Sequence, residues 1–223
     1  MEKKVKNTGL KLNSFQKDAL REISSITTGN ATTALSKMIN KGVEVSIPKA
    51  ELLKKQGLTK SLGGPKKMVM SIYCRITGDI TGQVLFLFRR DAAMELVSLL
   101  LGNEDSKTRM LDTYSESAFG EMANIFTGSY LNALAELFGL RILPGIPIVA
   151  TDYVGPIVDY VYGRIEDAEE KMFCFTTNIK VDKHDIDGDF VFMFDSNSYE
   201  KVLEKLETKY GVKKLKKKTK KKK

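Results

Sequence analysis

The sequence EISSITTG at residues 22–29 returns 99 residues later as EMANIFTG at residues 121–128. Without a gap, the same offset aligns residues 22–48 with residues 121–147. Eight positions are identical in the two stretches: Glu22/Glu121, Ile26/Ile125, Thr28/Thr127, Gly29/Gly128, Ala34/Ala133, Leu35/Leu134, Ile47/Ile146 and Pro48/Pro147. A repeat at a fixed offset indicates that the chain contains two copies of one structural unit.

The repeat continues at an offset of 106, where GQVLFLF at residues 82–88 aligns with GDFVFMF at residues 188–194. Each run is followed by a helix-like stretch, at 91–101 and at 198–206. Two copies are too few for a solenoid. We therefore expect one pseudo-symmetric domain in which both halves share a core.

Each half begins with a long stretch of helical periodicity, at about 14–40 and 115–138. Gly42 and Gly139 follow these stretches, as is typical of helix ends. Strand-like segments come next, at 43–47, 68–76, 81–88 and, in the second half, 141–144, 154–165, 171–181 and 190–194. The sequence thus predicts an α+β fold. It is a pseudo-twofold duplicated helix–strands–helix unit, with two long helices packed on a mostly antiparallel sheet.

Composition separates a nearly neutral body from a basic tail. The chain has 223 residues and a net charge of +8, but nine lysines lie between Lys213 and Lys223. Without them, 27 basic residues face 28 acidic ones. We predict a polar segment at 1–11, a single domain at 12–210 (halves at about 12–104 and 112–210), and a disordered Lys-rich tail at 211–223.

Several functional classes are disfavoured. The two cysteines form no CxxC motif, and we expect Cys74 and Cys174 to be reduced, buried core thiols. His184 is the one histidine, which excludes sites built on several histidines. The start is polar and the longest apolar runs are too short to span a bilayer, so we expect a soluble cytoplasmic protein.

Two loops are candidates for ligand binding. Residues 182–189 resemble a calcium loop, but glycine falls at the fourth position instead of the sixth, and Ser196 stands where an EF-hand has Glu. We expect a polar hairpin turn there, with His184 exposed. Residues 57–65 are expected to form a flexible loop, because the Gly-Lys-Ser/Thr order of a phosphate-binding loop is missing.

The second long helix carries a polar stripe. Ser117, Glu121 and Asn124 are spaced four and three residues apart, so they lie on one helix face. Asp18, Glu22 and Ser25 take the equivalent places in the first helix. In each copy a proline, Pro147 or Pro48, follows 23 residues after the third polar position. A polar stripe is ordinary on a surface helix, but Asn is a poor helix former, and the pattern is kept through the duplication.

This pattern resembles the signature of the CheC family of chemotaxis phosphatases, which also includes CheX and part of FliY. Ser117, Glu121, Asn124 and Pro147 match the signature at every position. The first copy matches at Asp18, Glu22 and Pro48 but has Ser25 where Asn is expected. The resemblance covers about residues 12–210. Two full copies are similar to CheC more than to CheX, and no length remains for the additional domain of FliY.

The resemblance implies a phosphatase that hydrolyses the aspartyl-phosphate of a CheY-like response regulator. Asn124 would orient the attacking water, Glu121 would dock the regulator's lysine, and Ser117 and Pro147 would support them. The first copy would be a degenerate site with weak or absent turnover. No cofactor or metal of the chain's own is implied, since Mg²⁺ is carried by the regulator.

The implied partners are the phosphorylated regulator and the deamidase CheD, with no nucleic acid or membrane. Two other interpretations remain open. One is a non-catalytic adaptor that binds the phosphorylated regulator or CheD. The other is nucleic-acid binding through the tail, which predicts that removing residues 213–223 abolishes function.

Overall fold

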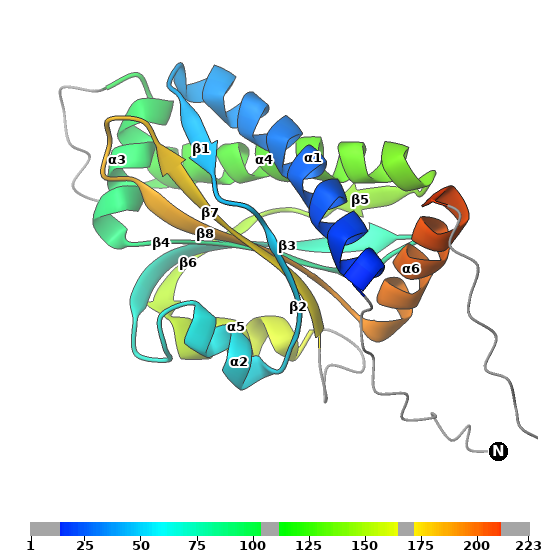
Figure 1. Ribbon diagram of the computed structural model, residues 1–223. Coiled ribbons are helices and arrows are strands. Elements are labelled where there is room, and N and C mark those ends of the chain that lie inside the picture. Colours follow the sequence, from blue (N-terminus) through cyan, green and yellow to red (C-terminus); the bar gives the residue numbers. More distant parts are fainter. Residues whose placement is uncertain (1–13, 104–111, 165–171, 211–223) are drawn as a thin grey trace, which may run out of the picture.

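The computed structural model describes residues 14–103, 112–164 and 172–210 (Figure 1). The elements of the first half are α1 (Ser14–Ile39), β1 (Val43–Val45), β2 (Lys49–Leu53), α2 (Lys55–Ser61), β3 (Met68–Gly78), β4 (Gly82–Phe88) and α3 (Arg90–Leu100). Those of the second half are α4 (Thr113–Phe138), β5 (Ile142–Pro144), β6 (Ile148–Tyr153), α5 (Val154–Tyr162), β7 (Met172–Val181), β8 (Asp187–Phe194) and α6 (Ser196–Tyr210). The segments predicted at 1–11 and 211–223 lie outside the described residues.

Both halves contain the same series of elements: a long helix, two strands, a short helix, two strands and a final helix. The predicted duplication and the α+β class are therefore confirmed. The long helices begin and end within two residues of their predicted bounds. The unit is richer than the predicted helix–strands–helix, because a short helix divides the strands of each half.

The strand predicted at 154–165 is wrong, because residues 154–162 form the helix α5. Val, Ile and Tyr favour strands when taken singly. However, Val154, Ile157, Val158 and Val161 recur at helical spacing, and all four are buried. Pro156 fits this helix because it stands in the first turn, where backbone N–H groups have no helical partner. Burial of the apolar face of α5 therefore outweighs the preference of its single residues for a strand.

The flexible loop expected at 57–65 is also wrong in part, because residues 55–61 form the helix α2. Leu58 is fully buried and anchors this helix. The hydroxyl groups of Thr59 and Ser61 donate to carbonyls one turn back, at 2.9 and 2.8 Å. Within residues 57–65, only Gly63 and Gly64 take positive φ angles, 101° and 95°, as expected in a turn.

All strand pairs of the sheet are antiparallel, in the order β1-β7-β8-β4-β3-β5, with β2 also beside β7 and β6 also beside β3. The halves exchange strands: β1 and β2 of the first half pair with β7 of the second, while β5 and β6 pair with β3. The registers correspond, since Val45 pairs with Ile179 and Pro144, 99 residues later, pairs with Ile76. The two halves therefore form one sheet whose centre is the β4–β8 pair.

The helices cover both faces of this sheet. In Figure 1, α1 and α4 lie above the sheet, and α2 and α5 lie below it. The upper core contains an aromatic cluster in which Phe126 and Tyr130 of α4 meet Phe190 of β8, with ring centroids 5.0 and 5.2 Å apart. The lower core packs α2 and α5 on Leu85, Val191 and Met193. Among the described residues, every helix is too short or too polar to span a membrane.

The helix α4 has clear local start and stop residues. Asp112 is its N-cap, and its side chain accepts a hydrogen bond from Ser115 N at 2.8 Å. Hydrogen bonds from Ser115 also lower the pKa of Asp112. Gly139 ends the helix in the left-handed conformation, with φ of 62°. The helix is therefore fixed at both ends and along its buried side, which makes it a rigid carrier for its outer face.

Candidate active site

The outer face of α4 carries the predicted polar stripe. Ser117, Glu121 and Asn124 are all exposed, whereas the other side of the helix is buried in the upper core (Phe119, Met122, Ala123, Phe126). The Ser117 hydroxyl donates to the Thr113 carbonyl at 2.8 Å. Glu121 and Asn124 are three residues apart, so their side chains are neighbours on the helix surface. The amide and the carboxylate are both presented to solvent and can meet a partner protein together.

Pro147 stands in the short loop between β5 and β6, and both strands pack against α4. The loop is anchored to β3, because Gly145 N donates to Arg75 O at 2.7 Å and the Cys74 thiol donates to Gly145 O at 3.1 Å. A Cβ at position 145 would lie 3.2 Å from Arg75 O, so glycine permits this close approach. The loop is held in one conformation by the sheet edge.

The first copy has the same construction. Asp18, Glu22 and Ser25 are exposed on α1, and Pro48 is buried in the loop between β1 and β2. Ser46 N donates to Asn178 O at 2.9 Å, which is the bond equivalent to Gly145–Arg75 in the second copy. Thr177 Oγ1 adds a bond to Ser46 O at 2.7 Å. The structure thus brings each set of predicted residues to one helix and its adjoining strands.

Sequence analysis did not single out two exposed isoleucines. Ile146 and Ile47 precede the two prolines, and their side chains are 87% and 80% exposed. These are the largest exposures among the large apolar residues that the structure describes. A single exposed apolar residue is ordinary on a protein surface, but its recurrence at the equivalent place of both copies suggests a contact for another protein. The repeat could have identified them, because Ile47 and Ile146 form one of its eight identical pairs.

The two helices differ in charge. The α4 sequence contains three glutamates and no lysine or arginine. In contrast, α1 contains Lys17, Arg21 and Lys37 against Asp18 and Glu22. Arg21 takes the place that Gly120 takes in the second copy, one turn before the third position of the motif. The outer face of α4 is therefore suited to a positively charged group, whereas that of α1 also attracts negative charge.

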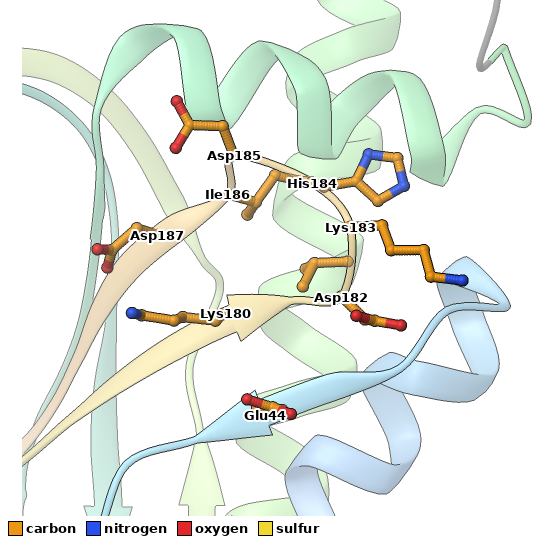
Figure 2. A pocket seen from close by; sticks show the side chains of 9 residues that line it. Glu44, Lys180, Asp182, Lys183, His184, Asp185, Ile186 and Asp187 are labelled. Atoms are coloured by element: carbon orange, nitrogen blue, oxygen red, sulfur yellow. The ribbon is translucent and has the colours of Figure 1, made fainter.

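A hollow of about 290 Å³ lies elsewhere, beside the turn between β7 and β8 (Figure 2). Charged side chains line it, but several are paired within the molecule: Asp185 with Arg89 at 2.7 Å and His184 with Glu95 of α3 at 2.8 Å. The predicted polar turn is confirmed. The expected exposure of His184 is wrong, since its side chain is only 20% exposed and fastens the turn to α3.

The remaining reactive groups are structural. Cys74 and Cys174 are buried and free, as expected for core thiols. Burial is the main cause that raises the pKa of both thiols, which keeps them protonated. Over residues 14–103, 112–164 and 172–210, no group of three or more His, Cys, Asp or Glu side chains is placed to hold a metal ion.

Comparisons with known proteins agree with this architecture. The profile of "Chemotaxis phosphatase CheX" matches residues 70–157, and that of the "CheC-like family" matches residues 15–52. The chain is 31% identical over 191 residues to the CheY-P phosphatase CheC of Bacillus subtilis, covering 84% of this chain and 91% of that protein. The crystal structure of Thermotoga maritima FliY is similar with a TM-score of 0.71 and 20% identity, covering 90% of this chain and 100% of that one. The FliM middle domain of H. pylori has a TM-score of 0.61 at 14% identity, with 87% and 99% covered.

The match to a CheY-P phosphatase over most of both chains, together with the CheX family model, places the chain in the class of chemotaxis phosphatases. Within that class, the length and the sequence identity of the match to CheC show which family the chain belongs to. The chain belongs to the CheC-like family.

Proposed function

We propose that this protein hydrolyses the aspartyl-phosphate of a CheY-like response regulator in the cytoplasm. The observation that carries the proposal is the exposure of Glu121 and Asn124 together on the outer face of a rigid helix. An exposed helix face can reach a phosphoryl group held in the active site of another protein, which a deep pocket could not do.

In this proposal Asn124 positions the water. Its side-chain carbonyl accepts a hydrogen bond from water, while its NH₂ group donates to a phosphoryl oxygen. Both groups lie on one rigid plane, so water and phosphorus are aligned for an in-line attack. The water oxygen bonds to phosphorus as the bond between phosphorus and the aspartate oxygen breaks. The products are the aspartate carboxylate and dihydrogen phosphate, which keeps both water protons.

Glu121 docks the regulator by pairing with the lysine of its active site. The absence of any basic residue on α4 favours this role, because no lysine or arginine of the same helix competes for the carboxylate. Ser117 and Pro147 hold the helix face and the neighbouring loop. Mg²⁺ neutralises charge on the phosphoryl group and belongs to the regulator, and we place CheD as a second partner.

The test follows the decay of phosphorylated regulator with wild type, Asn124→Ala and Glu121→Ala. We expect Asn124→Ala to lower the accelerated rate about 100-fold, as for loss of one positioned donor in other enzymes. Asn132→Ala is the matched control, because it removes an exposed amide from the same helix two turns later. Activity of Asn124→Ala equal to that of the control would overturn the proposal.

A non-catalytic adaptor is the second candidate. In the first copy, Ser25 stands at the position that Asn124 takes in the second, although that copy itself is kept. The fold is also shared with the FliM middle domain. The adaptor predicts that wild type slows the decay of phosphorylated regulator by sequestering it, whereas a phosphatase accelerates the decay.

A further inference from the structure

The docking features of the second copy are preserved in the first. Glu22 stands where Glu121 stands, and both are exposed. Ile47 and Ile146 project from equivalent loops at 80% and 87% exposure. Both loops are anchored by the same backbone hydrogen bond to the neighbouring strand, at 2.9 and 2.7 Å. The surface that would hold a regulator is therefore present twice.

The features that would perform the chemistry are not preserved. Ser25 replaces Asn124, and a hydroxyl group on one carbon cannot hold a water and a phosphoryl oxygen on one rigid plane. Arg21 replaces Gly120, one turn before this position. An added Cβ at Gly120 would meet no atom of a neighbouring element within 4 Å, so the helix surface beside Asn124 is open. In the first copy, the equivalent position of the helix surface carries the Arg21 guanidinium.

The Arg21 guanidinium is available to an incoming anion. Its pair with Asp18 is long, with Nη1 4.0 Å from Oδ1, and the two side chains are 57% and 75% exposed. Exposed pairs of this kind are weak and exchange readily with solvent and ligands. Arginine forms paired hydrogen bonds with phosphoryl oxygens and is always charged. Arg21 therefore has the position and the chemistry of a phosphoryl ligand.

We infer that the first copy is a capture site, which binds the phosphorylated regulator through Arg21 and Glu22 without hydrolysing it. This inference rests on the proposed function, because it takes the same regulator as the ligand. Glu22 pairs with the regulator's lysine and Arg21 with its phosphoryl group. One chain then binds two regulators, of which only the one on α4 is dephosphorylated.

The test measures stoichiometry by calorimetry with a regulator activated by beryllofluoride, a phosphoryl mimic that is not hydrolysed. We expect two regulators per wild-type chain, and one per chain for Glu121→Ala or for Glu22→Ala. In the Glu121→Ala background, Arg21→Ala should weaken the remaining binding at least 10-fold. Lys37→Ala is the matched control, because it removes a positive charge from the exposed side of the same helix, four turns later.

A gain of activity tests the chemical part. In the Asn124→Ala background, Ser25→Asn together with Arg21→Gly should restore phosphate release to at least 10 times the level of Asn124→Ala alone. Binding to the changed first copy without any restored release would contradict the roles given to these two positions. So would rapid release by Asn124→Ala itself, because the first copy would then be hydrolytic.

The outcomes separate this inference from the proposed function. One regulator per wild-type chain, unchanged by Glu22→Ala, overturns the capture site and leaves hydrolysis on α4 intact. If two regulators bind per chain but phosphate release does not depend on Asn124, the proposed hydrolysis is overturned and the capture site is supported.

Discussion

Ile146 shows how a single residue can be tied to function by its exposure. Its side chain is 87% exposed, although burying an isoleucine stabilises a fold by about 1.5–3 kcal/mol. The loop cannot turn it inward, because Gly145 is fixed to Arg75 by a 2.7 Å backbone bond. The residue contributes little to the fold, so we expect its contribution to appear when a partner covers it.

For Ile146→Ser we expect KM for the phosphorylated regulator to rise about 10-fold, because contact area is lost equally in the ground and transition states. The rate at saturation and the melting temperature should stay unchanged. Steady-state phosphate release gives both constants. Leu143→Ser is the control, since Leu143 is also exposed but lies in β5, outside the loop. Equal constants for Ile146→Ser and wild type would remove this residue from the docking surface.

Asp189 is a residue at which the two copies differ in charge. It lies 106 residues after Gln83, which is a buried, uncharged side chain at the equivalent place. Burial raises the pKa of Asp189, and Lys67, 3.9 Å away, offsets this only in part. The folded state therefore disfavours the ionised carboxylate relative to the unfolded chain.

We expect Asp189→Asn to raise the melting temperature at pH 7. The pKa of Asp189 is higher in the folded state than in the unfolded chain, where it is about 3.9. Between these two pKa values the folded state binds more protons, so the free energy of unfolding falls as pH rises. The gain should vanish below about pH 4, where the wild-type carboxyl is protonated in both states. Thermal unfolding across this range is the measurement, with exposed Asp182→Asn as control. A gain that persists at low pH would show that charge is not its cause.

At the scale of elements, the central strand pair depends on two equivalent glycines. In the pairing of β4 and β8, Gly82 is opposite Phe194 and Gly188 is opposite Phe88. An added Cβ at Gly188 would lie 2.1 Å from the Phe88 ring, and at Gly82 it would lie 2.2 Å from the Met193 carbonyl oxygen. A side chain can move aside more easily than the backbone of a central strand.

We therefore expect Gly82→Ala to destabilise the protein more than Gly188→Ala, which should cost about 1–3 kcal/mol as overpacked cores do. Phe88→Leu should recover part of the loss in Gly188→Ala and none of the loss in Gly82→Ala. Urea unfolding of the three single and two double variants measures these differences. A Gly82→Ala protein as stable as wild type would contradict the central position of this pair.

The sequence predicted the long helices and the long strands, and it missed the short helices α2 and α5. The long helices and the hairpin of β3 and β4 follow from periodicity and from Gly and Asp at the turns. The helix α5 was missed because its Val, Ile and Tyr residues favour strands locally, although its buried residues recur at helical spacing and pack on the sheet. The polar stripe of α4 was predictable from spacing. Exposure of Ile146 was not, because it depends on where the loop is anchored.

At the scale of the whole molecule, the exchange of strands makes the halves interdependent. The first half supplies β1 and β2 to β7, and the second supplies β5 and β6 to β3. The helices α1 and α4 also pack against each other. Neither half can complete its own part of the sheet, so the free energy of folding belongs to both together.

We expect residues 1–103 expressed alone to lack cooperative unfolding, and likewise residues 112–223. Mixed in equal amounts, the two fragments should associate and recover the circular dichroism of the intact chain, because all the exchanged pairs can form again. Gel filtration and thermal melts of each fragment and of the mixture are the measurements. A first fragment that melts cooperatively by itself would show that the exchanged strands are dispensable.

The exchange of β1–β2 for β5–β6 also bears on the origin of such a chain. A precursor of half the length could have filled its sheet only by trading its first two strands with an identical subunit, and would have existed as a homodimer. Once two such units are fused, the shared sheet requires both copies, whatever becomes of the polar motif in either one. Ser25 beside an intact Glu22 fits this arrangement, because the first copy departs from the motif while it still supplies β1 and β2 to the sheet.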